Sequence, residues 1–192
     1  MLKAAKHRKL IANMDSATQI LNVAERRMRQ TGYNAVSYRD IASEIGIKSA
    51  SLHYHFPKKE DLGIALARRY SENFSAALQV ISVTAKTPQD KIVAFADIFR
   101  TELKDHNLVC LCAVLGAEAA GLPESVNREV KAFFDINIKW LTAQYEALGS
   151  NNPVNDAKVT LSLLEGAMVI SAVNNDNTIF DAAVSSILKG FV

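Results

Sequence analysis

Apolar side chains recur every three or four residues along most of the chain, which is the spacing of the buried face of an α-helix. Ile20, Ala24 and Met28 show this spacing, and Leu62 and Leu66 repeat it further along. Only 8 Gly and 4 Pro interrupt the 192 residues. The pattern predicts an all-α protein of about nine helices, over residues 15–30, 37–45, 48–56, 58–82, 88–105, 108–120, 123–148, 155–173 and 178–189.

Several residues that favour helix ends stand where these periodic segments begin or stop. Ser37 is followed three residues later by Asp40, a spacing that resembles a capping box. Gly46 can adopt the left-handed backbone conformation that ends a helix and turns the chain. Thr87 precedes a proline and is followed by Asp90, which is a strong start signal. Together these signals predict two short helices, then a long one beginning near residue 58, then a further helix after a short connector.

The segment 37–62 contains the two short helices, the tight turn at Gly46 and the start of the third helix. In the second short helix, Leu52 and Phe56 lie four residues apart and face inward. This arrangement is that of a helix-turn-helix, whose second helix enters the major groove of DNA. The same spacing also fits an ordinary helical hairpin with a solvated polar face, so the pattern alone leaves both interpretations open. The outer face carries hydrogen-bonding side chains and no acid: Lys48, Ser49, Ser51, His53, Tyr54 and His55.

Charge is distributed unevenly along the chain, although the net charge is only +2. Residues 1–60 hold 11 Lys and Arg against 5 Asp and Glu, whereas residues 61–192 hold 11 against 15. A basic first third on an acidic body is expected when a phosphate-binding module is joined to a different kind of domain.

No apolar run reaches the roughly 18 residues of a membrane span, and the first residues lack the apolar block of a signal peptide. We therefore expect a soluble, cytoplasmic protein without a membrane partner.

The segment 1–14 is a basic N-terminal arm that precedes the first predicted helix. It fits either a disordered arm or an extension of that helix. Such an arm can reach the DNA backbone or minor groove beside the main contact, and it fits a solvated tail equally well. Its basic residues are Lys3, Lys6, Arg8 and Lys9.

The first third also carries a series of short motifs: Ile20-Leu21, Ala24, Gly32-Tyr33-Asn34-Ala35, Arg39-Asp40-Ile41-Ala42, Gly46-Ile47, Leu52-His53-Tyr54-His55-Phe56-Pro57 and Lys59-Glu60-Asp61-Leu62. Together these motifs resemble the DNA-binding domain of the TetR/AcrR family of bacterial transcriptional regulators. The resemblance covers about residues 16–64 by motif and the rest only as an architecture. It implies an N-terminal three-helix helix-turn-helix domain over 15–60, joined by a long helix to a C-terminal helical domain over 61–192 that binds a ligand and dimerises.

The start of the second short helix projects deepest into a major groove if the helix-turn-helix binds DNA. Lys48 can donate to guanine, Ala50 can meet a thymine methyl group, and the hydroxyl groups of Ser49 and Ser51 can bond to bases of either kind. The family resemblance further implies phosphate contacts by Ser37, Tyr38, Tyr54, His55 and Lys59.

Two histidines of this helix carry open questions. The position of His53 is more often a tyrosine in the family, so the usual role is in doubt there. The shorter, titratable ring can still bond to phosphate or a base. His55 has a competing interpretation, in which it packs and caps locally instead of contacting DNA.

The apolar body of the chain can enclose a small-molecule pocket, as the family resemblance implies, or its aromatic residues can simply fill a core. The two cysteines stand two residues apart, and with His106 they supply too few well-spaced ligands for a structural zinc site. Their main interpretation is as small buried apolar residues, with a redox-sensing or electrophile-sensing thiol as the alternative. We expect no cofactor. The candidate pocket residues are Phe95, Phe99, Cys110, Cys112, Phe133, Trp140 and Met168.

The last two predicted helices are apolar and rich in small residues, which fits core packing or an interface. In the resembled family this pair forms a four-helix interface with a second copy, and a two-fold DNA reader needs such a partner to grip a palindrome. The candidate interface residues are Leu164, Ala167, Ser171, Ile179, Ala183 and Ile187.

No Ser-His-Asp or Cys-His order and no phosphate-binding glycine loop stands out, so we do not expect an enzyme. The chain is therefore expected to be a ligand-responsive regulator of transcription, acting as a homodimeric repressor that a small-molecule inducer releases from a palindromic operator in double-stranded DNA. The alternative is a TetR-like DNA-binding protein that acts as an activator or without a ligand. A helical enzyme or ligand carrier is the remote alternative.

Overall fold

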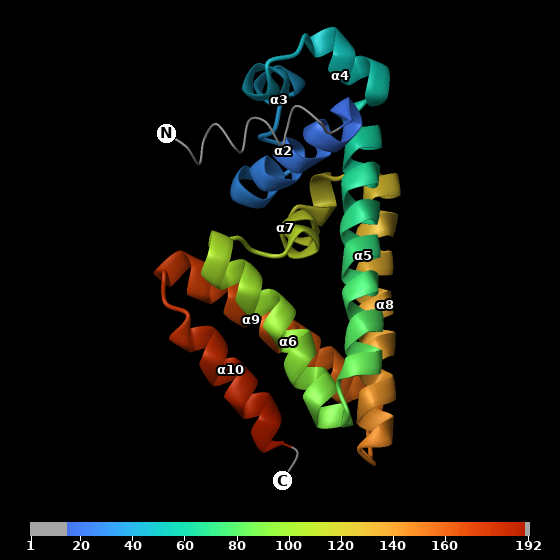
Figure 1. Cartoon of the computed structure of the whole chain (residues 1–192), viewed down its shortest axis with the longest axis vertical. Coiled ribbons are helices and arrows are strands. Elements are labelled where there is room, and N and C mark those ends of the chain that lie inside the picture. The colour runs from blue at the N-terminus through green and yellow to red at the C-terminus, as the bar shows by residue number, and fades with distance from the viewer. Residues whose placement is uncertain (1–14, 191–192) are drawn as a thin grey trace.

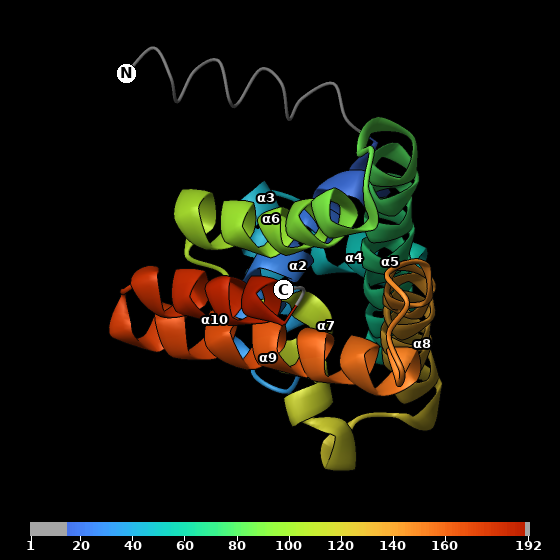
Figure 2. The same cartoon turned by 90° about the horizontal axis from the view of Figure 1, so that it is seen from below.

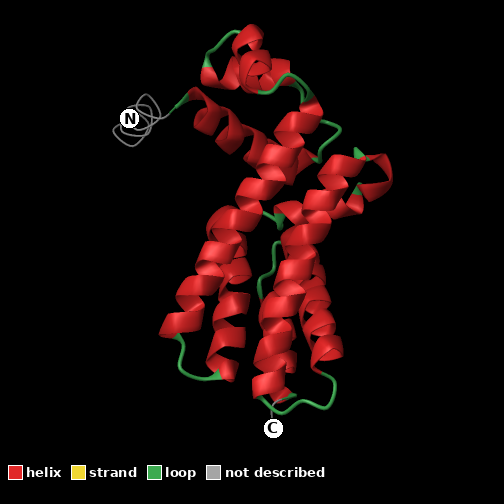
Figure 3. Cartoon of the chain, turned by 90° about the vertical axis from the view of Figure 1, so that its right-hand side faces the viewer, coloured by secondary structure: helices red, strands yellow, loops and turns green. Residues whose placement is uncertain are grey.

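The computed structural model describes residues 15–190, apart from the side chain of His106. Within this range nine α-helices and one short 3-10 helix form the regular structure, without any strand (Figure 3), which confirms the all-α prediction. The predicted arm over 1–14 lies outside the described residues, and no described helix is long and apolar enough to cross a bilayer. The helices are α2 (Ser16–Thr31), α3 (Tyr38–Ile45), α4 (Ser49–His55), α5 (Lys59–Thr84), α6 (Pro88–His106), α7 (Leu111–Ala117), η1 (Ala119–Gly121), α8 (Glu124–Ala147), α9 (Pro153–Asn174) and α10 (Thr178–Lys189).

Helices α2, α3 and α4 form a small bundle at one end of the molecule (Figure 1), which we call the N-terminal bundle. Ile20, Met28, Ile41 and Leu52 are fully buried there. These are the apolar positions that the helical period selects, so burial of this stripe explains why the three helices pack against one another.

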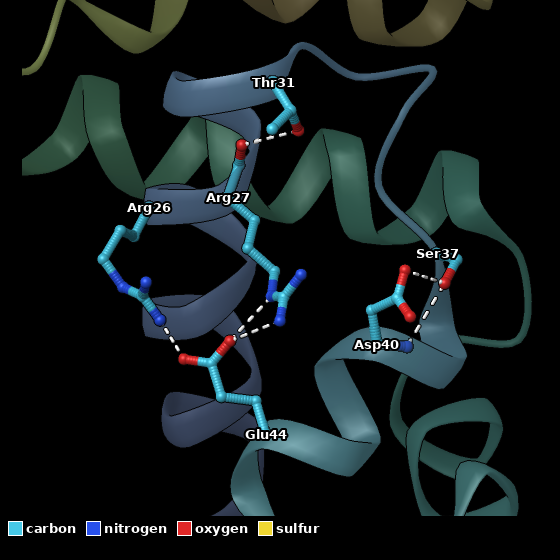
Figure 4. Close-up of polar contacts among 6 residues, drawn as sticks. All are labelled: Arg26, Arg27, Thr31, Ser37, Asp40 and Glu44. Atoms are coloured by element: carbon cyan, nitrogen blue, oxygen red, sulfur yellow. Dashed lines mark hydrogen bonds and ion pairs between the residues drawn. The ribbon is translucent and has the colours of Figure 1, made fainter.

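The predicted start and stop signals of α3 are confirmed, although the Asp40 carboxylate bonds to the Ser37 hydroxyl and does not complete a capping box. Ser37 Oγ accepts a hydrogen bond from the Asp40 N–H at 3.2 Å, which satisfies one of the free donors at the start of α3. Gly46 ends α3 with φ at 74°, a conformation that costs little only for glycine. Figure 4 shows how α2 holds α3, because both Arg26 and Arg27 pair with Glu44.

Helix α5 leaves the N-terminal bundle and runs the length of the molecule, with α8 packed along it (Figure 1). The remaining helices complete a helical body, in which α9 lies between α8 and α10 (Figure 2). Phe74 of α5 meets Phe95 and Phe99 of α6 and Phe133 of α8 at ring-centroid distances of 5.6, 5.4 and 5.2 Å. This aromatic cluster is the point at which the long helix is fixed to the body.

The helix predicted over 108–120 is shorter in the structure, since α7 covers only Leu111–Ala117 and η1 follows it. Asn107 ends α6 in the left-handed conformation with φ at 49°. The next residues have no regular secondary structure, and the carbonyl groups of Leu108 and Val109 accept hydrogen bonds from Arg29 at 3.4 and 2.7 Å. These carbonyls bond to a distant side chain and not to N–H groups of a helix. No local sequence signal indicates that long-range contact.

Arg29 therefore makes polar contacts that fasten the N-terminal bundle to the body, beside the hydrogen bonds from Arg69 of α5 to Asn22 and Glu25 of α2. Its side chain is only 5% exposed, and its guanidinium group lies 2.7 Å from Glu102 of α6 and 3.8 Å from Glu25 of its own helix. It also lies over the ring of Tyr70 on α5, at 5.8 Å from the centroid. One side chain of α2 thus contacts α5, α6 and the segment before α7.

Glu118 forms a further contact of this kind, from the turn between α7 and η1. Its carboxylate accepts hydrogen bonds from the N–H groups of Tyr33 and Asn34 at 3.0 and 3.2 Å, and from the Asn34 side-chain amide at 2.8 Å. Gly32 lies directly against it, where any side chain would collide with the carboxylate. The loop between α2 and α3 is therefore fixed by a residue of the body.

We expect that Glu118→Ala will lower the free energy of unfolding by about 1–2 kcal/mol, because two backbone N–H groups lose their charged acceptor. Urea denaturation measures the change, and faster amide hydrogen exchange at Tyr33 and Asn34 locates it. Glu146→Ala, at an exposed position on α8, is the matched control and should leave both quantities unchanged. Equal behaviour of the two variants would contradict the proposed contact.

Candidate functional site

The outer surface of the N-terminal bundle presents one face of α4. Lys48 is the N-cap of this helix, and Ser49, Ala50 and Ser51 form an exposed first turn of small side chains. Tyr54 is 82% exposed on the same helix. A first turn of small residues allows another molecule to approach the backbone closely, while the serine hydroxyls remain available for hydrogen bonds.

Nearby carboxylates are held by internal partners. Asp40 accepts a hydrogen bond from Ser37 Oγ at 2.6 Å, and Glu44 is paired with two arginines of α2. Asp61 accepts from the Lys58 N–H at 2.9 Å, which caps the start of α5. None of these carboxylates forms an ion pair with a basic side chain of α4 or its flanking residues. These three carboxylates therefore form no ion pair that neutralises the positive charge around α4.

Three exposed cations flank this face, namely Arg39 on α3, Lys48 before α4 and Lys58 before α5. None of them forms an ion pair within residues 15–190. Arg39 and Lys58 were not among the predicted contact residues. The signal that could have found them is position, since Arg39 follows the cap of α3 and Lys58 immediately precedes α5.

Lys59 and Tyr38, both predicted to contact phosphate, have internal partners. The Lys59 ammonium group donates to the Asn34 carbonyl at 3.1 Å and lies 4.8 Å from the centroid of the Tyr33 ring. Burial lowers the pKa of Lys59, and nearby Glu118 acts in the opposite direction. The Tyr38 hydroxyl lies 2.9 and 2.6 Å from the carbonyls of residues 56 and 58, and burial raises its pKa. Both residues fix the geometry of the bundle, and Lys58 is the better candidate for phosphate.

The two histidines of α4 occupy different environments. His53 is exposed, with Nδ1 at 3.3 Å from the Pro57 carbonyl and its ring at 4.8 Å from the Tyr38 ring. His55 is half-buried and makes an edge contact with Tyr54 at 5.3 Å. The packing of His55 supports the interpretation of a local role, while His53 keeps one ring nitrogen available at the surface.

The predicted pocket residues are brought together in the body, where most of them are completely buried. Phe95 packs against Phe99 at 5.5 Å and stacks on Trp140 at 5.6 Å, and Phe133, Cys110, Cys112 and Met168 are also buried. In this conformation the aromatic side chains fill the core, which is the alternative interpretation of the pattern. Their role in a ligand pocket stays a prediction.

Cys110 and Cys112 are free thiols that are completely buried. Burial raises the pKa of both thiols, and the carboxylate of Glu165 adds to the effect. The thiolate is the reactive form of cysteine, so protonated and buried thiols are poor nucleophiles. The surroundings therefore favour the interpretation of the pair as buried apolar residues.

Glu165 is a buried acid on α9 that sequence reasoning missed. The residue is 9% exposed, and no N–H or O–H group of the described residues donates to either carboxylate oxygen. Burial raises its pKa to about 7, while the Cys110 thiol, a weak hydrogen-bond donor near the carboxylate, and the Arg29 guanidinium group act in the opposite direction. The signal that could have revealed it is a charged residue between Leu161 and Met168 on a helix face that is otherwise apolar.

The raised pKa of Glu165 makes stability depend on pH. Since the folded protein holds this proton more tightly than the unfolded chain, the free energy of unfolding should fall as pH rises from about 4.5 to about 7, and level off above that. In the Glu165→Gln variant, we expect the fall in the free energy of unfolding over this pH range to be smaller by more than about 1 kcal/mol. Urea denaturation across that pH range is the measurement, with Glu146→Gln as the control. A Glu165→Gln profile that follows the unmodified protein would contradict the assignment.

The predicted interface residues need a correction. Leu164, Ala167 and Ser171 of α9 and Ala183 and Ile187 of α10 are buried inside the protomer, and Ile179 is half-buried. The five buried residues therefore do not form the outer surface of the pair, whereas Ile179 remains partly exposed. The exposed apolar face of α9 is a different one. It consists of Val159, Leu163, Val169, Ile170 and Val173.

We call this set of five side chains the α9 stripe. Gly166 lies within it and has open space where a side chain would stand. Val173 is 81% exposed. A contiguous exposed apolar surface of this kind is unusual on a monomer and marks a surface for association.

The first third of the chain matches the family model described as bacterial regulatory proteins of the tetR family, over residues 20–66. The HTH-type transcriptional repressor KstR2 of Mycolicibacterium smegmatis is 32% identical over 74 residues. That match covers 38% of this chain and only 36% of the repressor. The family model therefore covers α2 to the start of α5, and each of the two matches covers less than half of the chain.

Solved structures extend the similarity to almost the whole chain. A TetR transcriptional regulator from Legionella pneumophila is 34% identical, with a TM-score of 0.88 over 92% of this chain and 97% of that one. A TetR-family regulator from Agrobacterium tumefaciens is 31% identical, with a TM-score of 0.86 over 90% and 95% of the two chains. The chain therefore belongs to the TetR family of bacterial regulatory proteins, which are DNA-binding regulators of transcription and not enzymes.

Proposed function

We propose that the protein is a homodimeric repressor in the cytoplasm that binds a palindromic operator through α4 and leaves it when a small molecule binds the body. Residues 15–60 form the DNA-binding part in this proposal, and residues 61–192 form the ligand-binding and dimerisation part. The observation that carries it is the acid-free face of α4, with an exposed first turn flanked by cations that have no acidic partner within the described residues.

In the proposed complex, contacts divide into those that read sequence and those that give affinity. Lys48, Ser49, Ala50 and Ser51 lie at the start of α4, the part of a recognition helix that contacts base edges. Tyr54, Arg39 and Lys58 are exposed around them and supply phosphate contacts, which dominate affinity and carry no sequence information.

We expect that Lys48→Ala will reduce the preference for operator over scrambled DNA by about tenfold, because one base contact is lost. Lys58→Ala should weaken binding to both duplexes alike and lower the slope of log affinity against log salt by about 1. Fluorescence anisotropy with a duplex selected from a random pool measures both effects. Lys139→Ala, at an exposed position on α8, is the control. Identical losses for Lys48→Ala and Lys58→Ala on both duplexes would contradict this division.

The α9 stripe is the proposed dimer surface, and its occupant is the same stripe of a second copy. A two-fold contact places like surfaces against each other, which suits an apolar face. The exposed side chains of α10 beside it are small, at Ala182, Ser185 and Ser186, so a partner helix can approach closely. A second copy is also what two-fold operator recognition requires.

Ligand response needs a physical connection between the body and the N-terminal bundle, and the contacts of Arg29 and Glu118 supply it. Both reach the segment from 107 to 121, which holds α7 and lies between the two parts (Figure 1). A ligand that fits a different position of α7 better would carry the loop between α2 and α3 with it. The ligand then needs only a few kcal/mol of preference for that conformation to empty the operator.

A further inference from the structure

The packed faces of α8 and α9 hold several buried oxygen atoms that lack a hydrogen-bond partner within the described residues. Both carboxylate oxygens of Glu165 are in this state, as are Asn137 Oδ1 and Ser171 Oγ. All three residues are at least nine-tenths buried. Native proteins pair nearly all buried polar groups, so each of these unpaired acceptors requires an explanation, above all the carboxylate of Glu165.

A surface depression of about 450 Å³ opens between the same two helices. Glu165 lies in its lining, next to apolar side chains from both helices, Phe134 and Ile138 of α8 and Leu161 of α9. Lys158 also lines it. The volume is within the range of small-molecule sites, and the combination of apolar walls with one buried polar group is typical of them.

The charges around Glu165 do not balance. Arg29 is paired with Glu102 and Glu25, and Arg69 donates to Glu25 at 2.7 Å. When Glu165 is ionised, the cluster holds three carboxylates against two guanidinium groups, and the carboxylate without an ion-pair partner is that of Glu165. A ligand with a single positive charge would balance the cluster, and an N–H donor would satisfy the unpaired oxygens.

We propose that the inducer is a small organic monocation, an amine or amidine on an apolar body, which binds between α8 and α9 with its N–H groups donating to Glu165. The apolar body lies against Phe134, Ile138 and Leu161. This proposal rests on the proposed function, in which a small molecule controls DNA binding. It specifies the chemical class of that molecule and the residue that selects it.

The position of Glu165 also connects the site to the operator. The Cys110 thiol and the Arg29 guanidinium group both act on this carboxylate. Cys110 directly follows Leu108 and Val109, whose carbonyls hold Arg29. A ligand that draws the Glu165 carboxylate toward the depression therefore changes the surroundings of the segment that fastens the N-terminal bundle.

The test uses the full chain without DNA at pH 8, and pairs of ligands that differ only in the head group. Phenylalkyl, adamantyl and linear alkyl amines are titrated by calorimetry beside the alcohols of the same skeleton. We expect the tightest amine to bind at least tenfold more tightly than its alcohol. Glu165→Gln should abolish that preference and leave the alcohol unchanged. Absence of a preference across the panel, or a preference that survives Glu165→Gln, overturns the proposal.

A second variant tests the location of the site. Lys158→Gln removes the one cation that lines the depression, and it should tighten amine binding two- to fivefold by relieving like-charge repulsion. Unchanged or weaker amine binding in this variant places the amine elsewhere and contradicts the proposal. Lys139→Gln, which lies outside the depression on α8, is the matched control.

Operator release is measured separately, by anisotropy with the selected duplex. An amine that binds as expected but leaves the complex with DNA intact supports the site and refutes the ligand-responsive repressor. Release of DNA by compounds that carry no positive charge, with no amine binding, refutes the site and supports the repressor. The two proposals can therefore fail independently.

Discussion

Replacing Ile170 with glutamate is expected to convert the protein from a dimer into a monomer and to weaken operator binding by about two orders of magnitude. Ile170 is 51% exposed within the α9 stripe. In a two-fold interface the stripes of both copies meet, so each new carboxylate must be desolvated against an apolar surface. A monomer holds only one half-site and loses the gain in effective concentration that a linked second recognition helix provides.

Sedimentation equilibrium measures the oligomeric state of the Ile170→Glu variant, and anisotropy with the palindromic duplex measures its affinity. Val83→Glu is the matched control, because Val83 is an 84% exposed valine at the end of α5, away from α9. It should remain dimeric and bind normally. A dimeric Ile170→Glu protein would refute the α9 stripe as the interface, and a monomer with full affinity would refute two-fold recognition.

Arg29→Met is expected to produce the largest loss of stability, about 3 kcal/mol in the free energy of unfolding. Methionine fills much of the same volume but supplies no donor, so the Val109 carbonyl and the Glu102 carboxylate lose their partner. The Arg29 side chain is buried, and its loss leaves the part-buried Leu108 and Val109 carbonyls without their charged donor, while Glu102, at 32% exposed, is only partly solvated by water. Urea denaturation monitored by circular dichroism measures the loss.

Arg26→Met is the control for this substitution. Arg26 is an exposed arginine on the same helix, and its partner Glu44 retains Arg27 (Figure 4), so the change should stay within about 0.5 kcal/mol. A loss of equal size in both variants would show that helix α2 tolerates neither, and would refute a special role for Arg29. If Arg29 also transmits the ligand signal, folded Arg29→Met protein should still bind the operator, and the inducer should release less of it from DNA.

Local signals allowed most of the helices and their ends to be predicted. Ser37, Gly46 and Thr87 each act through neighbours within four residues, and the structure shows the predicted caps at each of them. The face of α4 could also be predicted, because Leu52 is buried and the residues on its other side are exposed. Short-range chemistry is visible in a single sequence because both partners stand in the same segment.

The face of α9 could not be predicted in the same way. Apolar side chains surround this helix, with Leu161, Leu164 and Met168 inward and Val159 and Ile170 outward. A helix that is apolar on all sides has no periodic contrast, so the pattern cannot indicate which side meets the protomer's own core. The predicted interface residues were therefore taken from the inner face.

The contacts of Arg29 and Glu118 escaped prediction for a different reason. Their main-chain partners lie 79 to 85 residues away along the chain and have no sequence signature. Glu165 was visible only as one charge on a largely apolar helix face, and its burial depends on tertiary packing that no local pattern specifies.

The use of main-chain acceptors by Arg29 has a consequence for how such proteins diversify. Every residue type carries the same carbonyl group, so side chains at 108 and 109 can be exchanged without losing the hydrogen bonds that join the two parts. Under the proposed function, residues around the ligand site can change toward new compounds while the hydrogen bonds that link the body to the N-terminal bundle are kept. A single arginine thus allows the proposed ligand-binding part to change independently of the part that binds DNA.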